Sequence, residues 1–294
     1  MFGALVNPYP VQRDDPDYPY FEPRRSSGSY TEMREGRLQN LHLYDGSRCN
    51  RACDFCIVAG SPKGWHKAYC RETLDFALEL VHPEGLLKFF GGEPTLYPAE
   101  ILAAVRYVKK RGFQGKFRLY SNGVRAKQLI ALLEAIPEMD AVLNYSILNG
   151  RGAPPIPSGA MKKLLEFPGN RIASGHPDLV DINAPVPLSE KDSDEIGNFG
   201  GSCANCFPSL RSDGRFHGCP FAVEKLDPHF DLGRVGQTSP RAALKNFEAF
   251  YRWQSEVLEP RARELGVHPC RACDRHLSEI DEPILSDFSE CARD

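Results

Sequence analysis

The sequence predicts an α/β protein: an open, partial TIM-like barrel of about six strand–helix units, (β/α)6, followed by a small cysteine-rich C-terminal domain. From Leu38 onward, short apolar runs alternate with amphipathic stretches of helical length, which is typical of parallel strands joined by helices. Six of the ten cysteines follow residue 200, which sets the end of the chain apart. We therefore expect an irregular N-terminal extension over residues 1–37, the barrel over 38–190 and the cysteine-rich domain over 191–294.

The elements of the barrel are expected in a regular order. The extension is rich in Pro, Tyr, Arg and Ser and shows no sustained periodicity. After it, the pattern predicts strands over 41–44, 86–90, 116–120 and 141–147. It predicts helices over 73–81, 98–111, 126–136 and 158–167, and a C-terminal helical segment over 239–265. Shorter apolar stretches follow at 179–182 and 184–187. A polar or glycine-rich loop follows each strand. Because functional groups gather at the carboxyl ends of barrel strands, these loops should form one site.

Composition and charge limit the classes of function. Lys and Arg total 36 against 39 Asp and Glu, so no basic excess indicates nucleic acid as a partner. No run of 18 apolar residues occurs, and the first residues lack a basic stretch followed by an apolar signal core. We therefore expect a cytoplasmic protein with no membrane partner. In such a chain, ten cysteines indicate reduced metal ligands and not disulfides.

Three cysteines directly follow the first expected barrel strand. Cys49, Cys53 and Cys56 have the spacing Cys-x3-Cys-x2-Cys. Thiolates hold iron–sulfur clusters, and three of them on one loop can bind a cubane while its fourth iron stays open for chemistry. A structural zinc site would need a fourth ligand close by, and a redox dithiol would not need the third cysteine. The triplet therefore predicts a catalytic iron–sulfur cluster.

A second motif, Gly91-Gly92-Glu93-Pro94, follows the strand expected over 86–90. Glycines let a ligand approach the backbone closely, and a carboxylate can accept hydrogen bonds from an ammonium group, although the four residues alone could be an ordinary turn. With Phe55 and the cysteine triplet, the motif resembles the radical S-adenosylmethionine (SAM) superfamily over residues 38–187. The resemblance implies a [4Fe-4S] cluster that binds SAM, a reductant such as flavodoxin or ferredoxin, and a 5'-deoxyadenosyl radical that abstracts hydrogen from a substrate.

The same resemblance implies roles for individual residues. Gly91, Gly92, Glu93 and Pro94 would contact the methionine amino group of SAM, and Phe55 would lie near the adenine. Ser121, Asn122 and Ser146 would hold the ribose or the carboxylate of SAM, although the segment 121–123 could equally be a plain turn.

The C-terminal cysteines predict a second metal site. The order of these cysteines resembles the SPASM or shorter twitch extension, which implies an auxiliary [4Fe-4S] cluster. They are Cys203 and Cys206, Cys219 at the end of a Gly-x4-Cys hairpin, and the pair Cys270 and Cys273. Five cysteines compete for at most four positions on one cubane. Cys203, Cys206 and Cys219 could leave one iron open for substrate, or Cys270 or Cys273 could close the cluster. A zinc ribbon made of the two Cys-x2-Cys pairs is the other alternative.

The remaining cysteines, Cys70 and Cys291, belong to no pattern. Each is most simply a buried or surface thiol, although a thiol near the site could donate hydrogen to a substrate radical. The segment Lys63–Lys67, with sequence Lys-Gly-Trp-His-Lys, is most simply a solvated loop, or it could clamp an anionic or sugar-like substrate.

The expected reaction is oxidation or epimerisation, at carbon, of a small polar substrate such as a sugar, an aminocyclitol or a nucleoside. The 48 residues before Cys49 are fewer than the peptide-recognition domain that peptide-modifying members often carry. A peptide-modifying maturase or epimerase is the alternative. A non-enzymatic iron–sulfur or zinc protein is an alternative from another class, in which Glu93 would have no purpose.

Overall fold

A computed structural model describes residues 33–53, 56, 58–143, 156–174, 208–219, 223, 224, 226, 228–265, 272 and 273. Within these residues, one nine-stranded sheet has the order β6-β5-β4-β3-β2-β7-β8-β9, with the short β1 (Met33–Arg34) beside β2. None of the helices in this part of the chain is long and apolar enough to cross a membrane.

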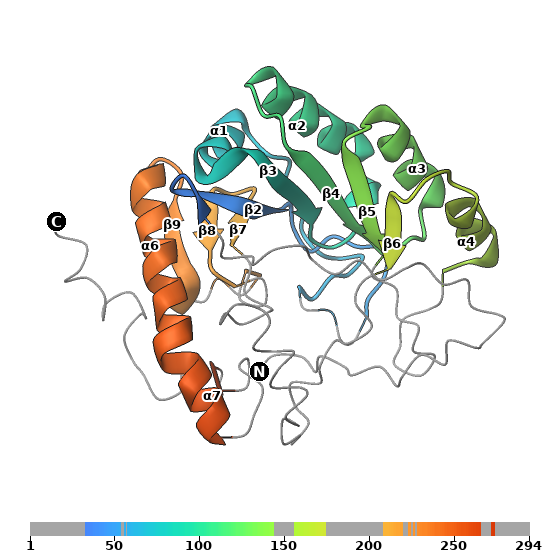
Figure 1. The fold of residues 1–294 in the computed structure, drawn as a ribbon. Coiled ribbons are helices and arrows are strands. Elements are labelled where there is room, and N and C mark those ends of the chain that lie inside the picture. The colour runs from blue at the N-terminus through green and yellow to red at the C-terminus, as the bar shows by residue number, and fades with distance from the viewer. Residues whose placement is uncertain are drawn as a thin grey trace.

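Parallel strands form the larger part of the sheet and follow one another in chain order. They are β2 (Arg37–Tyr44), β3 (Val81–Phe90), β4 (Lys116–Ser121), β5 (Met139–Leu143) and β6 (Ile172–Ser174). The helices that connect or flank them are α1 (Arg71–Leu80), α2 (Pro98–Lys110), α3 (Ala126–Ala135) and α4 (Ser158–Leu165), with a 3-10 turn, η1 (Pro94–Leu96), before α2. Helices α1 to α4 lie along one face of the sheet (Figure 1). The expected mixed α/β fold with a parallel sheet is confirmed.

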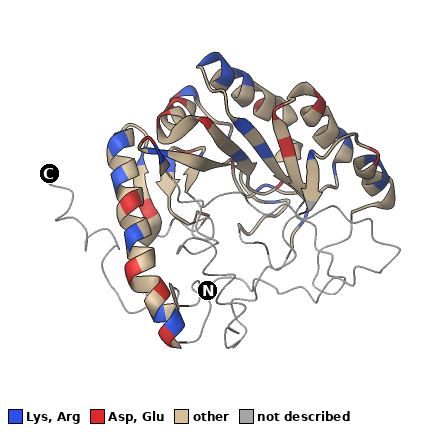
Figure 2. Cartoon of the chain, in the orientation of Figure 1, with Lys and Arg blue, Asp and Glu red and all other residues tan. Residues whose placement is uncertain are grey.

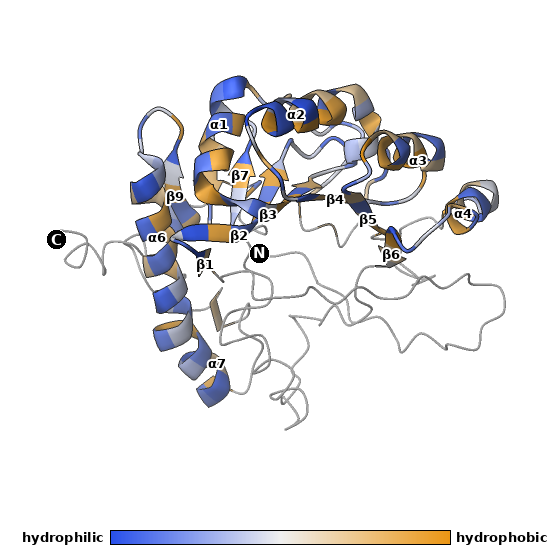
Figure 3. Cartoon of the chain, turned by 45° about the horizontal axis from the view of Figure 1, so that its top comes forward, coloured by the Kyte–Doolittle hydropathy of each residue, from blue (hydrophilic) through white to orange (hydrophobic). Residues whose placement is uncertain are grey.

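Alternating strand residues explain why the helices cover this face. Leu41, Leu43, Leu87, Phe89 and Phe117 are at most 2% exposed and belong to one apolar core with residues of the helices. Burying each such side chain stabilises the fold by about 1.5–3 kcal/mol. The helices carry hydrophobic and hydrophilic residues on different sides (Figure 3), and charges of both signs are interspersed over them (Figure 2).

The C-terminal part extends the same sheet at the other edge of β2. Strand β7 (Ser209–Arg211) pairs parallel to β2, and β8 (Arg215–His217) and β9 (Asp231–Arg234) continue antiparallel, with η2 (Pro228–Phe230) before β9. The tight turn between β7 and β8 has Gly214 at φ 89°, a conformation that glycine adopts without strain. The sixth unit expected near 179–187 lies outside the described residues.

A long helical segment packs on this edge. It consists of α6 (Pro240–Trp253), a π-helical stretch η3 (Gln254–Leu258) and α7 (Glu259–Leu265), as expected for 239–265. It begins where the Ser239 hydroxyl accepts a hydrogen bond from the Ala242 amide, at 3.2 Å. Phe247 and Phe250 on α6 pack against Phe216 and Phe230, so the helix and the β7–β9 strands share one core.

Candidate cluster and cofactor site

The loops after β2, β3 and β4 meet at one end of the sheet. Tyr44, the last residue of β2, pairs in register with Phe90, the last residue of β3. The cysteine loop follows Tyr44, and Gly91 follows Phe90. On the next strand, Ser121 ends β4 and Asn122 follows it. The expectation that these three loops form one site is therefore consistent with the structure.

Backbone hydrogen bonds join the glycine-rich motif to the segment that leads into Cys49. The Gly92 amide donates to the Gly46 carbonyl at 2.7 Å, and the Glu93 amide donates to the Arg48 carbonyl at 2.9 Å. A Cβ atom on Gly92 would lie 2.1 Å from the Arg48 carbonyl oxygen, so only glycine permits this approach. The two motifs are thus held together by main-chain contacts.

The cysteine loop folds back on itself. The Cys49 amide donates to the Ser61 carbonyl, and the Arg48 amide to the Trp65 carbonyl, both at 2.9 Å. Gly60 lies at the centre of the fold: a Cβ atom there would lie 3.3 Å from Cys56 Sγ, 3.4 Å from Cys49 Cβ and 3.5 Å from Gly92 Cα. Cys49, Cys56 and the glycine-rich motif therefore surround one point.

N–H groups point at two of the sulfur atoms. Cys49 Sγ accepts from the Arg51 amide at 3.4 Å and from Asn122 Nδ2 at 3.6 Å, and Cys56 Sγ accepts from the Gly60 amide at 3.2 Å. Such donors stabilise thiolates and tune the potential of a bound cluster. Burial raises the pKa of the Cys49 thiol, and the hydrogen bond from the Arg51 amide opposes that rise.

The donor set fits an iron–sulfur cluster in its chemistry: three thiols on one loop, two of them supplied with N–H donors. Among the residues that the structure describes, no three His, Cys, Asp or Glu side chains lie close enough together to hold a metal ion as they stand. Cluster binding therefore requires the thiols to turn toward a common centre. The ligand role of Cys53, which is half-buried, stays a prediction.

Glu93 connects the ends of β3 and β4. Its carboxylate is 1% exposed, and its Oε1 accepts from the Thr95 amide at 3.1 Å, the Thr95 hydroxyl at 2.5 Å and the Ser121 hydroxyl at 2.8 Å. Oε2 accepts from the Asn122 amide at 2.7 Å. Burial raises the pKa of Glu93, and these four donors oppose that rise. The buried carboxylate therefore ties the Thr95 turn after β3 to the Ser121–Asn122 turn at the end of β4.

The other predicted residues are distributed as follows. Cys70 is exposed at the start of α1, on the helix-covered side of the sheet, with its Sγ 3.1 Å from the Thr73 hydroxyl. Cys219 and Cys273 are each 6% exposed and belong to one apolar core. The predicted residues that lie outside the described ones are Phe55, Ser146, Cys203, Cys206, Cys270 and Cys291.

Sequence analysis missed a polar cluster beside the cysteine loop, formed by Tyr44, Trp65, Arg211 and Glu224. The Glu224 carboxylate accepts from the Tyr44 hydroxyl at 2.6 Å and from Trp65 Nε1 at 2.9 Å. The Arg211 guanidinium lies 4.7 Å from the Trp65 ring centre and 3.9 Å from Glu224 Oε2. Burial, and then Glu224, raise the pKa of Tyr44, so its hydroxyl remains a donor. This cluster, Tyr44–Trp65–Arg211–Glu224, joins the cysteine loop to the segment after Cys219.

The prediction of a solvated loop over Lys63–Lys67 is wrong for its two aromatic residues. Trp65 is half-buried in the polar cluster. His66 stacks on Tyr97 with ring centres 3.4 Å apart, and its Nε2 lies 2.9 Å from Glu100 Oε2. Lys63 and Lys67 are exposed, as expected for solvated cations. The loop is therefore fixed against the sheet by its aromatic side chains.

We expect Trp65→Phe, which removes the indole N–H donor, and Glu224→Gln, which removes the charge of its acceptor, each to lower the free energy of unfolding by up to about 1.5–3 kcal/mol. Denaturant titration of the apoprotein measures this change. The double variant should lose less stability than the two single variants lose together, since both changes affect the same hydrogen bond. Glu166→Gln, at an exposed carboxylate, is the control. Additive losses would show that the two side chains do not interact.

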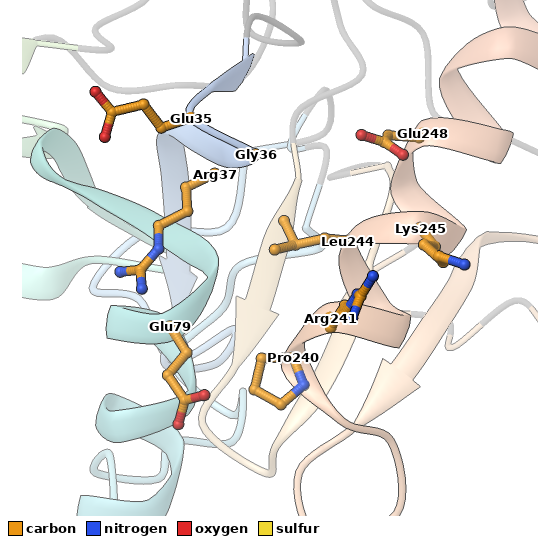
Figure 4. A pocket seen from close by; sticks show the side chains of 9 residues that line it. All are labelled: Glu35, Gly36, Arg37, Glu79, Pro240, Arg241, Leu244, Lys245 and Glu248. Carbon is orange, nitrogen blue, oxygen red and sulfur yellow. The ribbon is translucent and has the colours of Figure 1, made fainter.

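A groove of about 410 Å³ lies at the other end of β2. Charged side chains of both signs line it, from the start of β2, the end of α1 and the first turns of α6 (Figure 4). Arg37 in its wall is the first residue of β2, whereas the cysteine loop follows the last. Because barrel chemistry gathers at the carboxyl ends of strands, we assign this groove no part in the reaction.

Comparisons with known proteins agree with this geometry. Residues 43–147 match the profile of the Radical SAM superfamily. No curated protein sequence matches the chain.

Three solved structures are similar. A structure of BtrN in complex with AdoMet and 2-DOIA has a TM-score of 0.51 at 17% identity and covers 74% of this chain and 87% of that one. Native anSMEcpe with bound AdoMet has a TM-score of 0.53 at 14% identity, and the match covers 80% of this chain and 90% of anSMEcpe. The same enzyme with AdoMet and the Kp18Cys peptide has a TM-score of 0.52 at 15% identity, again covering 80% and 90%. At these identities the likeness shows a shared fold. The profile match over residues 43–147 is the evidence for a radical SAM domain there, as the cysteine triplet implied.

Proposed function

We propose that this radical SAM protein cleaves SAM reductively and abstracts hydrogen from a small polar substrate, such as a sugar, an aminocyclitol or a nucleoside, leading to oxidation or epimerisation at carbon. One observation carries the proposal: the cysteine loop and the Gly91–Pro94 motif are locked together by two backbone hydrogen bonds at the carboxyl ends of β2 and β3. A flavodoxin or ferredoxin would supply the electron.

Each part of the site has a distinct task in this proposal. Cys49, Cys53 and Cys56 would hold a [4Fe-4S] cluster, and the N–H groups of Arg51, Gly60 and Asn122 stabilise its thiolates. When bound, the cluster would supply the electron for reductive cleavage of SAM, and SAM would supply the radical that removes the substrate hydrogen.

The backbone around the glycine-rich motif would position SAM. Gly91 and Gly92 let the motif pack against Asp45 and the Arg48 carbonyl, and Glu93 holds the Ser121–Asn122 turn beside the motif, where the methionine amino group would bind. Ser121 and Asn122 would then be held within reach of the ribose or carboxylate. Phe55 and Ser146 are proposed for the adenine and for SAM binding on the resemblance alone.

The face of the sheet opposite the helices favours a polar substrate. His42, Lys88, Arg118 and Asp140 are directly paired along β2, β3, β4 and β5, so they point to the same face. Arg118 holds Asp140 through two hydrogen bonds, at 2.7 and 3.0 Å. BtrN is bound to 2-DOIA in one similar structure and anSMEcpe to a peptide in another. A peptide substrate is therefore the second candidate.

The product distinguishes the two reaction types. If the substrate radical is oxidised, the product loses a pair of hydrogens. If a thiol such as Cys291 returns a hydrogen atom, the product keeps its mass and, in deuterated water, gains one deuterium at the inverted carbon. We propose oxidation, because the chain has enough cysteines to close an auxiliary cluster that accepts the second electron. Mass spectrometry of the product tests this, and an unchanged mass with solvent deuterium would overturn it.

The C-terminal cysteines are proposed to bind an auxiliary [4Fe-4S] cluster. Cys219 and Cys273 are each buried, at 6% exposure, and their ligand roles are proposed on the resemblance. Cys203, Cys206 and Cys270 would supply the other positions. We expect anaerobically prepared protein to contain about eight irons per chain, the sum of two cubanes. About four irons and one zinc would instead indicate the zinc ribbon.

A further inference from the structure

A small apolar patch lies on the face of the sheet opposite the helices, at the end where the cysteine loop begins. Its members are Tyr44, Val58, Phe90 and Val223, each at most 7% exposed. Tyr44 and Phe90 are register partners at the ends of β2 and β3. Their neighbours Leu43 and Phe89 belong to the core that the helices cover. Because side chains alternate along a strand, the inner apolar patch faces the other side.

The inner apolar patch adjoins the iron–sulfur site. Cys56, Trp65 and Tyr120 are half-buried and pack against it. Cys56 is one of the three proposed ligands of the catalytic cluster, and its sulfur accepts from the Gly60 amide at 3.2 Å. One side of the cysteine loop is therefore lined by apolar side chains.

Val223 reaches this patch from the C-terminal part of the chain, and hydrogen bonds on both sides of its side chain keep it there. The Arg211 guanidinium, on β7, donates to the Val223 carbonyl. The next residue, Glu224, accepts from the Tyr44 hydroxyl at 2.6 Å and from Trp65 Nε1 at 2.9 Å. Val223 is 0% exposed as a result, although it is 167 residues from Cys56 in the sequence.

We propose that Val223 is a shielding residue, which keeps water from the Cys56 side of the catalytic iron–sulfur cluster and thereby lowers its reduction potential. The inference rests on the proposed function of the cysteine loop. Reduction adds negative charge to a cluster that three thiolates already hold, and water stabilises added charge better than apolar side chains do. An apolar cover therefore disfavours the reduced state and makes the reduced cluster a stronger electron donor to SAM.

The test uses Val223→Thr in the full chain, because threonine has nearly the shape of valine and adds a hydroxyl group to the inner apolar patch. The catalytic cluster is identified by EPR as the signal that shifts when SAM is added. Pulsed EPR of that signal in deuterated buffer should show stronger deuterium modulation in Val223→Thr than in the parent protein. Redox titration of the same signal should give a higher midpoint potential.

Val223→Ala is the second variant, because it leaves room for water without adding a hydroxyl group. It should change the deuterium modulation and the midpoint potential in the same directions as Val223→Thr. The two variants together separate an effect of water from an effect of the threonine hydroxyl.

Val108→Thr is the matched control. Val108, in α2, is also 0% exposed, but it belongs to the core on the helix-covered face. Both threonine variants should lower the midpoint temperature of unfolding, since each buries a hydroxyl group. Val108→Thr should nevertheless leave the deuterium modulation and the midpoint potential at the values of the parent protein.

Parental modulation and potential in both Val223 variants, at full iron content, would overturn the inference. Equal changes in Val108→Thr would also overturn it, because the effect would then follow from lost stability. If the parent protein gives no EPR signal that responds to SAM, the proposed function fails and the inference fails with it. That result appears before any variant is compared, so the two failures are distinguishable.

Discussion

Replacing Cys49, Cys53 and Cys56 with alanine is expected to abolish SAM cleavage. These three thiols are the proposed protein ligands of the catalytic cluster, and without them no iron remains to deliver an electron to SAM. Liquid chromatography of reactions with dithionite and SAM would measure 5'-deoxyadenosine, which should fall to the level of a reaction without protein. Iron analysis should show that about four irons remain, since the proposed C-terminal cluster would be held by other cysteines.

Cys70→Ala is the control for the triple variant. Cys70 is exposed at the start of α1, on the opposite side of the sheet from the polar row of His42 and Lys88. Its loss should leave both iron content and 5'-deoxyadenosine formation unchanged. Formation of 5'-deoxyadenosine by the triple variant would show that the cluster is bound elsewhere.

Gly92→Ala is expected to have the second largest effect. The new Cβ atom would meet the Arg48 carbonyl oxygen at 2.1 Å and the Arg48 carbonyl carbon at 2.4 Å, so backbone must move. That movement breaks the hydrogen bonds from Gly92 to Gly46 and from Glu93 to Arg48. We expect a loss of about 1–3 kcal/mol in the free energy of unfolding, typical of overpacking, and a lower iron occupancy of the cysteine loop.

The control for this change is Gly159→Ala in α4. No atom lies within 4 Å of a Cβ at Gly159, and alanine favours a helix, so stability should stay the same or rise. Denaturant titration and iron analysis of both variants make the comparison. Full stability and iron content in Gly92→Ala would contradict the close packing of the two motifs.

Local patterns were sufficient to predict helices α1 to α4 and the parallel strands β2 to β5, although strand β6 was not expected. The strands expected over 86–90 and 116–120 lie within β3 and β4, and the helices expected over 98–111 and 126–136 match α2 and α3 to within a residue or so. Apolar runs and helical periodicity show which face of a strand or helix is buried, and this signal lies in residues that are close together in the sequence. The pairing of β7 with the far edge of β2 has no such local signal.

Long-range side-chain contacts account for what sequence analysis missed. Trp65 and Glu224 are 159 residues apart, and no pattern links them in the sequence, so their hydrogen bond follows only from the fold. The hydrogen bond from the side-chain amide of Asn122 to Cys49 Sγ joins residues that are 73 positions apart. Asn122 was expected near SAM through the family resemblance, but its bond to a cluster thiol was not. The cysteine and glycine-rich motifs were recognisable because their spacing is local.

Anaerobic incubation of the reconstituted protein with dithionite and SAM tests the central claim most directly. The proposed site predicts that 5'-deoxyadenosine accumulates only when protein, reductant and SAM are all present, because the electron must pass from a reduced cluster in the Cys49–Cys56 loop to SAM. Absence of 5'-deoxyadenosine from protein that carries its full complement of iron would contradict the assignment of this site to SAM cleavage.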